Sequence, residues 1–173
     1  NKSIVESILK NVQKNGDSAI KKYEKKFGGA TLTSLRVSES EIKNAYSKIS
    51  KSELDSIRFA KKRLEKTEKT IKSILKNKTI KHDGIKILKK FNPLNSVGCY
   101  VPGGLAKYPS SAVMSVVPAK VAGVKRIEVV SPPNSNGVID PLTIVAANIC
   151  GATEIYKTGG AQSVAALSYG TKS

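Results

Sequence analysis

Two loops that contain paired glycines hold the residues of this sequence best suited to bind a small molecule. The first glycine loop is Tyr100–Gly104 (Tyr-Val-Pro-Gly-Gly), and the second glycine loop is Thr158–Gln162 (Thr-Gly-Gly-Ala-Gln). Each loop follows a predicted strand and leads to a predicted helix. Glycine lets a ligand approach the backbone closely, and free amides at the start of a helix favour anions. Neither loop matches G-x-G-x-x-G or the P-loop, so these residues indicate a ligand crevice without specifying its ligand.

Side chains suited to other chemistry are few. The sequence contains one histidine, His82, and two cysteines, Cys99 and Cys150. His82 lies beside a predicted turn, where a lone exposed histidine is more often structural than catalytic. The spacing of the cysteines fits neither a metal motif nor a disulfide framework, and we interpret both as buried free thiols.

The elements that must position the two glycine loops belong to the carboxyl-terminal half. Strands are predicted over residues 97–101, 126–130 and 153–156, and helices over 109–121, 141–149 and 161–169. Alternating strands and helices are typical of a parallel sheet, whose strands all end at the same edge. Because the two loops follow the first and third strands, we expect them to face one crevice. Pro118 lies inside the first helix and predicts a kink or a restart there.

The amino-terminal half is predicted to be mostly helical. Helices are expected over residues 3–15, 17–27, 40–49 and 52–74, a strand over 32–37, and a β-hairpin over 79–88 around Asp83-Gly84. Ser3 with Glu6 forms a capping-box pattern, Asp17 is the expected cap of the second helix, and Ser38 or Ser40 caps the third.

The net charge of +17 comes mainly from lysine in the first half of the chain. Residues 1–92 hold 24 of the 30 Lys and Arg residues and 10 of the 13 acidic ones. Nucleic-acid recognition favours arginine and aromatic stacking, whereas this sequence has few arginines, three Phe and no Trp. We therefore interpret the lysines as solvated helix faces and expect no nucleic-acid partner.

Hydrophobic residues make up 39% of the sequence, which is enough for a sizeable core. No stretch approaches the roughly 20 apolar residues that a transmembrane helix needs. The amino terminus has no apolar signal segment, since Glu6 interrupts the only candidate. If the first residues are original, we expect a cytoplasmic protein that does not bind membranes.

Several segments occur in the order and spacing found in histidinol dehydrogenases. They are Gly98–Gly104, Pro109–Ser111, Val117–Val124, Ser131–Pro133, Gly159–Gln162 and Ala165–Leu167. The helical half agrees more loosely, through Gly16-Asp17, Tyr23, Phe27 and Ala45-Tyr46. Over essentially its whole length, the sequence resembles the amino-terminal portion of this family.

The resemblance implies an enzyme that oxidises L-histidinol to L-histidine through histidinal, in two NAD-dependent steps that complete histidine biosynthesis. Members of the family are cytoplasmic homodimers with one zinc in each active site. Two residues that contact NAD in the family fall on Tyr100 and Gln162. An aromatic ring with a hydroxyl group, and a carboxamide that both donates and accepts, suit that task.

The resemblance also implies that the chemistry lies elsewhere. Family members are more than twice as long, and their zinc ligands, catalytic bases and substrate contacts match no part of this chain. One histidine cannot supply a zinc site. We therefore assign no catalytic or metal residue here, and we expect the 173-residue chain alone to be inactive.

The expected fold is α/β, with a helical amino-terminal region followed by the start of a Rossmann-like parallel domain. Residues 1–96 are expected to be a helix-rich region with a β-hairpin, part of a first domain completed by further chain. Residues 97–173 are expected to be the first part of an NAD-binding domain. Two alternatives stay open: a non-catalytic nucleotide-binding module and, with less support, a lysine-rich nucleic-acid-binding protein.

Overall fold

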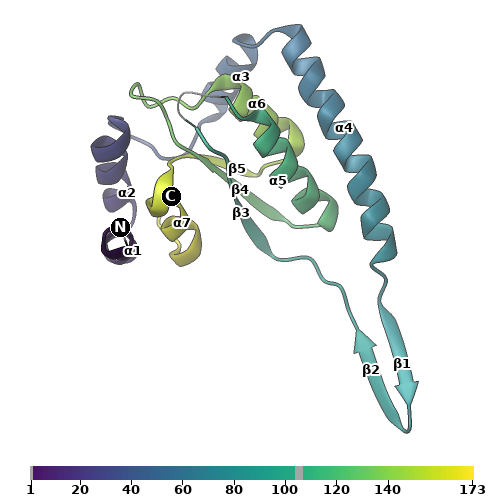
Figure 1. Cartoon of the computed structure of the whole chain (residues 1–173). Coiled ribbons are helices and arrows are strands. Elements are labelled where there is room, and N and C mark those ends of the chain that lie inside the picture. Colours follow the sequence, from purple (N-terminus) through teal and green to yellow (C-terminus); the bar gives the residue numbers. More distant parts are fainter. Residues whose placement is uncertain (1, 104–106) are drawn as a thin grey trace.

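The computed structural model, which describes residues 2–103 and 107–173, has a parallel sheet between two groups of helices (Figure 1). The sheet contains β3 (Ser96–Tyr100), β4 (Arg126–Ser131) and β5 (Glu154–Lys157), in that order. All three strands run in the same direction. This arrangement confirms the predicted α/β class.

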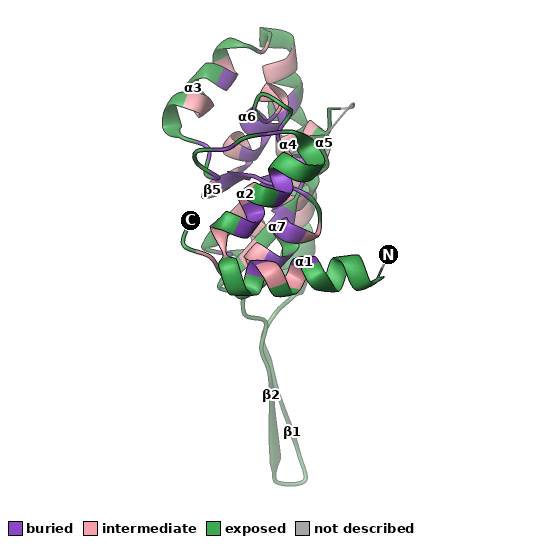
Figure 2. Ribbon diagram, turned by 90° about the vertical axis from the view of Figure 1, so that its left-hand side faces the viewer, coloured by how far each residue is buried: buried purple, intermediate pink, exposed green. Residues whose placement is uncertain are grey.

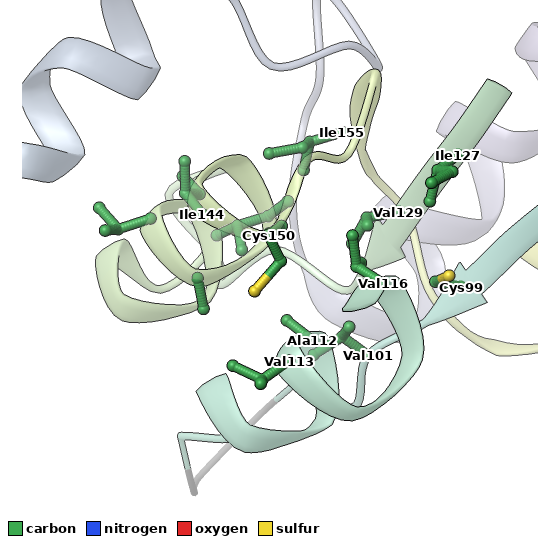
Figure 3. Close-up of a cluster of buried hydrophobic side chains, with 14 of the residues drawn as sticks. Cys99, Val101, Ala112, Val113, Val116, Ile127, Val129, Ile144, Cys150 and Ile155 are labelled. Atoms are coloured by element: carbon green, nitrogen blue, oxygen red, sulfur yellow. The ribbon is translucent and has the colours of Figure 1, made fainter. Parts of the chain in front are cut away.

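Four helices cover one face of the sheet. They are α5 (Pro109–Ala122) and α6 (Pro141–Cys150), with α3 (Glu39–Ser47) and α4 (Lys51–Ile74) packed outside them. Side chains of a strand alternate between its two faces, so Ile127 and Val129 of β4 point into this layer (Figure 3). Cys99 and Cys150 are free and buried in the same cluster, as expected. Burial raises the pKa of both thiols, that of Cys150 to about 11.

The opposite face is covered by α1 (Lys2–Asn15), α2 (Asp17–Tyr23) and α7 (Gly160–Tyr169). Val130 points into this layer and packs in one cluster with Ile20 and Tyr23 of α2. Helix α7 lies so close to β3 that a Cβ at Gly98 would be only 2.5 Å from Cδ1 of Leu167. The amino-terminal helices pack mainly against α7 and share one buried cluster with the sheet that carries the two glycine loops.

The first two helices differ from prediction at their ends. Helix α1 already includes Ser3, so Ser3 and Glu6 do not form its cap. Asp17 is the first residue of α2 rather than its cap, which is Gly16. Beyond Tyr23 the chain continues as a π-helical turn, η1 (Glu24–Gly28). The third helix begins as predicted, with a complete capping box at Ser38.

Two further segments differ from the prediction. The segment 32–37 is predicted as a strand, but the chain bends at residues 33 and 35 and forms none. It borders β5, where the Val37 N–H donates to the Ile155 carbonyl at 2.8 Å. Its one isolated bridge pairs Arg36 with Tyr156. Helix α5 continues through Pro118 without the restart that the proline predicted. Val117 before the proline is buried, and Ala119 and Val121 after it are partly buried against the same core, which holds the chain on both sides.

The predicted hairpin is formed by β1 (Lys78–His82) and β2 (Ile85–Lys89), and it projects away from the rest of the molecule (Figures 1 and 2). All residues of both strands are exposed, and Ile80 pairs with Ile87. His82 lies beside Asp83, with Nδ1 2.8 Å from Oδ2. In the described part of the chain, no helix has both the length and the apolar character needed to cross a bilayer.

Candidate functional site

The loops that follow the three parallel strands meet at one edge of the sheet. Tyr100 ends β3 opposite Val130, and Ser131 ends β4 opposite Lys157, so the strands end level with one another. A hollow of about 390 Å³ lies between the loops after β3 and β4. It is lined by Pro102, Gly103, Ser131, Pro132, Asp140 and Thr143, among others.

Pro132 lies between Gly103 of the first loop and Gly159 of the second, and it explains why each position needs a glycine. A Cβ at Gly103 would be 2.9 Å from the Pro132 Cγ, and a Cβ at Gly159 would be 2.7 Å from its Cβ. Only a residue without a side chain fits on either side of the proline ring at these distances. Gly104, the last residue of the first glycine loop, lies outside the described residues.

The structure brings both predicted cofactor residues to this edge but gives them different environments. Tyr100 is 43% exposed, and its hydroxyl accepts a hydrogen bond from the Gly160 N–H at 3.3 Å. Gln162 lies in the first turn of α7 and is only 4% exposed. The two glycine loops are therefore in direct contact, with the tyrosine ring outside and the carboxamide inside.

Glu24, a buried carboxylate at the start of η1, was not predicted from the sequence to lie at this site. Its Oε1 accepts hydrogen bonds from Thr158 Oγ1 at 2.7 Å, from the Gly159 N–H at 3.0 Å and from Gln162 Nε2 at 2.9 Å. Glu24 is 3% exposed. Helical spacing could have found it, because Glu24 lies four residues after Ile20 and so on the buried face of that helix.

A second long-range carboxylate contact lies immediately before the second glycine loop. Nζ of Lys157, a residue only 7% exposed, is 2.9 Å from Oε1 of Glu41. Burial raises the pKa of Glu41, but hydrogen bonds from Ser38 and Lys157 outweigh it and hold that pKa below its ordinary value. This ion pair attaches α3 to the carboxyl end of β5.

We predict that Glu41 makes folding stability depend on acid pH. A carboxylate whose pKa is lowered by folding stabilises the folded state above its unfolded pKa, and this contribution is lost as the pH falls through the folded pKa. Between about pH 6 and about pH 3, the parent protein should lose more unfolding free energy than Glu41→Gln. Urea unfolding followed by circular dichroism measures this difference, and equal losses in the two proteins would contradict the prediction.

Among the residues that the structure describes, no group of three or more His, Cys, Asp or Glu side chains could hold a metal ion. The strand ends offer an exposed aromatic ring, Tyr100, and a buried carboxamide, Gln162.

Comparisons with known proteins agree on one family. The family model described as histidinol dehydrogenase matches residues 1–173. Histidinol dehydrogenase of Methanococcus maripaludis is 47% identical over 169 residues, covering 98% of this chain and 40% of the relative. That of Geobacillus kaustophilus is 47% identical over 165 residues, covering 95% and 39%.

A solved structure agrees with the sequence relatives. The crystal structure of histidinol dehydrogenase from Elizabethkingia anophelis matches with a TM-score of 0.93 and 33% identity, covering 99% of this chain and 39% of that one. The chain thus spans about 40% of the length of the relatives it matches. On this evidence the chain belongs to the histidinol dehydrogenase family.

Proposed function

We propose that this chain is the amino-terminal part of an NAD-dependent, zinc-containing histidinol dehydrogenase, which converts L-histidinol to L-histidine through histidinal. The observation that carries the proposal is the match along the whole chain, with 47% identity to one relative and a TM-score of 0.93 to a solved one. We further propose that the full-length protein is a cytoplasmic homodimer, as its resemblance to the family implies.

The fold supports a cofactor site at the carboxyl end of β3. The helical connections α5 and α6 lie on one face of the sheet, and the chain steps through them from β3 to β4 and then to β5. Helix α7 lies on the other face and contacts β3. A right-handed connection through α7 would therefore reverse the direction and place a following strand beside β3. Such a reversal is the switch point at which open α/β sheets bind ligands, and Tyr100 stands there.

The residues present fit a dinucleotide in their chemistry. NAD, when bound, supplies the hydride acceptor, while this chain would bind and orient it. The exposed Tyr100 ring offers a flat apolar surface, and its hydroxyl offers a polar atom. Gln162 uses its Nε2 on Glu24, so its Oε1 is the atom left to accept a hydrogen bond from the cofactor.

The zinc of the proposed enzyme needs ligands from elsewhere in the protein, because the described residues of this chain contain no metal-binding cluster. We propose that the zinc ligands, the acid and base residues and the histidinol contacts belong to the part of the enzyme that the relatives have in addition.

The full-length protein tests the proposal. We expect purified enzyme to release two NADH for each L-histidinol consumed, followed by absorbance, and to contain about one zinc per chain by metal analysis. A protein that binds NAD but does not oxidise histidinol would instead support the non-catalytic nucleotide-binding module.

A further inference from the structure

We propose that Glu24 is a positioning residue for the cofactor: it holds the second glycine loop in the shape that receives NAD. This inference rests on the proposed function, because it assigns Glu24 a role at the same site. Glu24 itself belongs to the amino-terminal helical region, outside the strands and loops that form the site.

The first support is the convergence of three donors on a single oxygen. Thr158 and Gly159 at the start of the loop and Gln162 at its end all donate to Oε1 of Glu24, at 2.7–3.0 Å. Hydrogen bonds to a carboxylate are shorter and stronger than those between neutral groups. With 3% of Glu24 exposed, water does not compete for them. One side chain therefore ties the start of the loop to its end.

The second support is the local backbone at Glu24. The helix widens from α2 into the π-helical turn η1 at this residue, and Gly29 ends the turn with a left-handed φ of 71°. Tyr23, one residue earlier, is buried in the same cluster as Val130 of β4. The backbone is thus held in place before and after Glu24, so its carboxylate has a fixed position relative to the loop.

The third support is the orientation imposed on Gln162. A carboxamide can turn over, exchanging its oxygen and nitrogen, unless its partners distinguish them. Since a carboxylate only accepts, Glu24 selects the orientation in which Nε2 faces it and Oε1 is free. The same oxygen of Glu24 accepts the hydrogen bond from the Gly159 N–H and so directs that amide into the protein. Binding then requires no reordering of the loop, which improves affinity without a direct contact between Glu24 and NAD.

The test uses the full-length enzyme with Glu24→Gln, and Glu41→Gln as a matched control. Glu24 is buried and Glu41 is half-buried. Each contacts the segment 157–162, from which it is separated by more than a hundred residues in the sequence. We expect Glu24→Gln to raise the NAD KM by roughly fivefold or more, the loss of about one hydrogen bond. The kcat and the histidinol KM should change less than about twofold. Glu41→Gln should lower the melting temperature without changing the NAD KM.

A double-mutant cycle separates positioning from general stability. Because Glu24 acts partly through Gln162 and partly through Thr158 and Gly159, Glu24→Gln combined with Gln162→Ala should raise the NAD KM by less than the product of the two single effects. Effects that multiply in full would overturn the inference, because they would show that Glu24 and Gln162 act on NAD independently. If Glu24→Gln does not fold, Glu24→Asp is measured with the same expectations.

The remaining outcomes distinguish the two proposals. An NAD KM that is unchanged in Glu24→Gln but raised in Gln162→Ala would overturn the role of Glu24 and leave the proposed cofactor site intact. An NAD KM unchanged in both variants would overturn the site and the inference together.

Discussion

In the full-length enzyme, Gln162→Ala is expected to raise the NAD KM by roughly 5- to 150-fold. The substitution removes the carboxamide that we propose as a cofactor contact, and the loss of such hydrogen bonds weakens binding by about 1 to 3 kcal/mol. It also removes one of the three donors to Glu24, which loosens the second glycine loop. Both effects act on NAD, so the KM for histidinol should change much less.

Substitutions of Tyr100 provide the comparison. Tyr100→Phe should raise the NAD KM less than Tyr100→Ala, since the ring would still pack against the cofactor. Zinc content should equal that of the parent in all three variants, because neither residue is expected to bind the metal. Steady-state kinetics with varied NAD at saturating histidinol measures the effect. A parental NAD KM in both Gln162→Ala and Tyr100→Ala would mean that the cofactor binds elsewhere.

Gly159→Ala is expected to weaken both the fold and cofactor binding. The new Cβ would be 2.7 Å from the Cβ of Pro132, a contact that the rigid ring cannot relieve by turning. Overpacking of this kind costs about 1 to 3 kcal/mol of unfolding free energy. Because the loop must move away from Pro132, it also shifts relative to Tyr100, and the NAD KM should rise several-fold, about as much as one lost hydrogen bond.

Gly28→Ala is the matched control for this substitution. A Cβ at Gly28 would lie 3.8 Å from Oε2 of Glu24, an ordinary contact, and the backbone there is not left-handed. Gly159→Ala should differ from the parent in both its free energy of unfolding, measured with urea, and its NAD KM. Gly28→Ala should match the parent closely in both. A Gly159→Ala enzyme as stable as the parent would show that the loops adapt around Pro132 more freely than this packing indicates.

The sequence predicted most of the secondary structure because the relevant signals are local. Asp83-Gly84 alone specifies a hairpin turn, and Pro109 and Pro141 mark helix starts that the structure confirms. The topological rule for parallel sheets then brought Tyr100 and the second glycine loop together, although they are sixty residues apart.

The errors arose where a residue's role depends on a distant partner. The apolar pattern of 32–37 resembles a strand, but pairing with β5 is limited to one bridge at Arg36, because the chain bends at residues 33 and 35. Glu24 lies in a lysine-rich stretch and looks like a surface charge, since the donors that make its burial favourable follow 134 to 138 residues later. Helical spacing from Ile20 places Glu24 on the buried face, but no local pattern identifies its distant donors.

The same separation orders events during synthesis of the protein. Helices α1 and α2 are synthesised before β4, β5 and α7, yet their apolar residues Ile8, Val12 and Ile20 share one buried cluster with residues of those later elements. Glu24 likewise meets Thr158 only after more than a hundred further residues have been added. Until then the nascent chain exposes the apolar faces of α1 and α2, which are open to chaperones or to neighbouring chains.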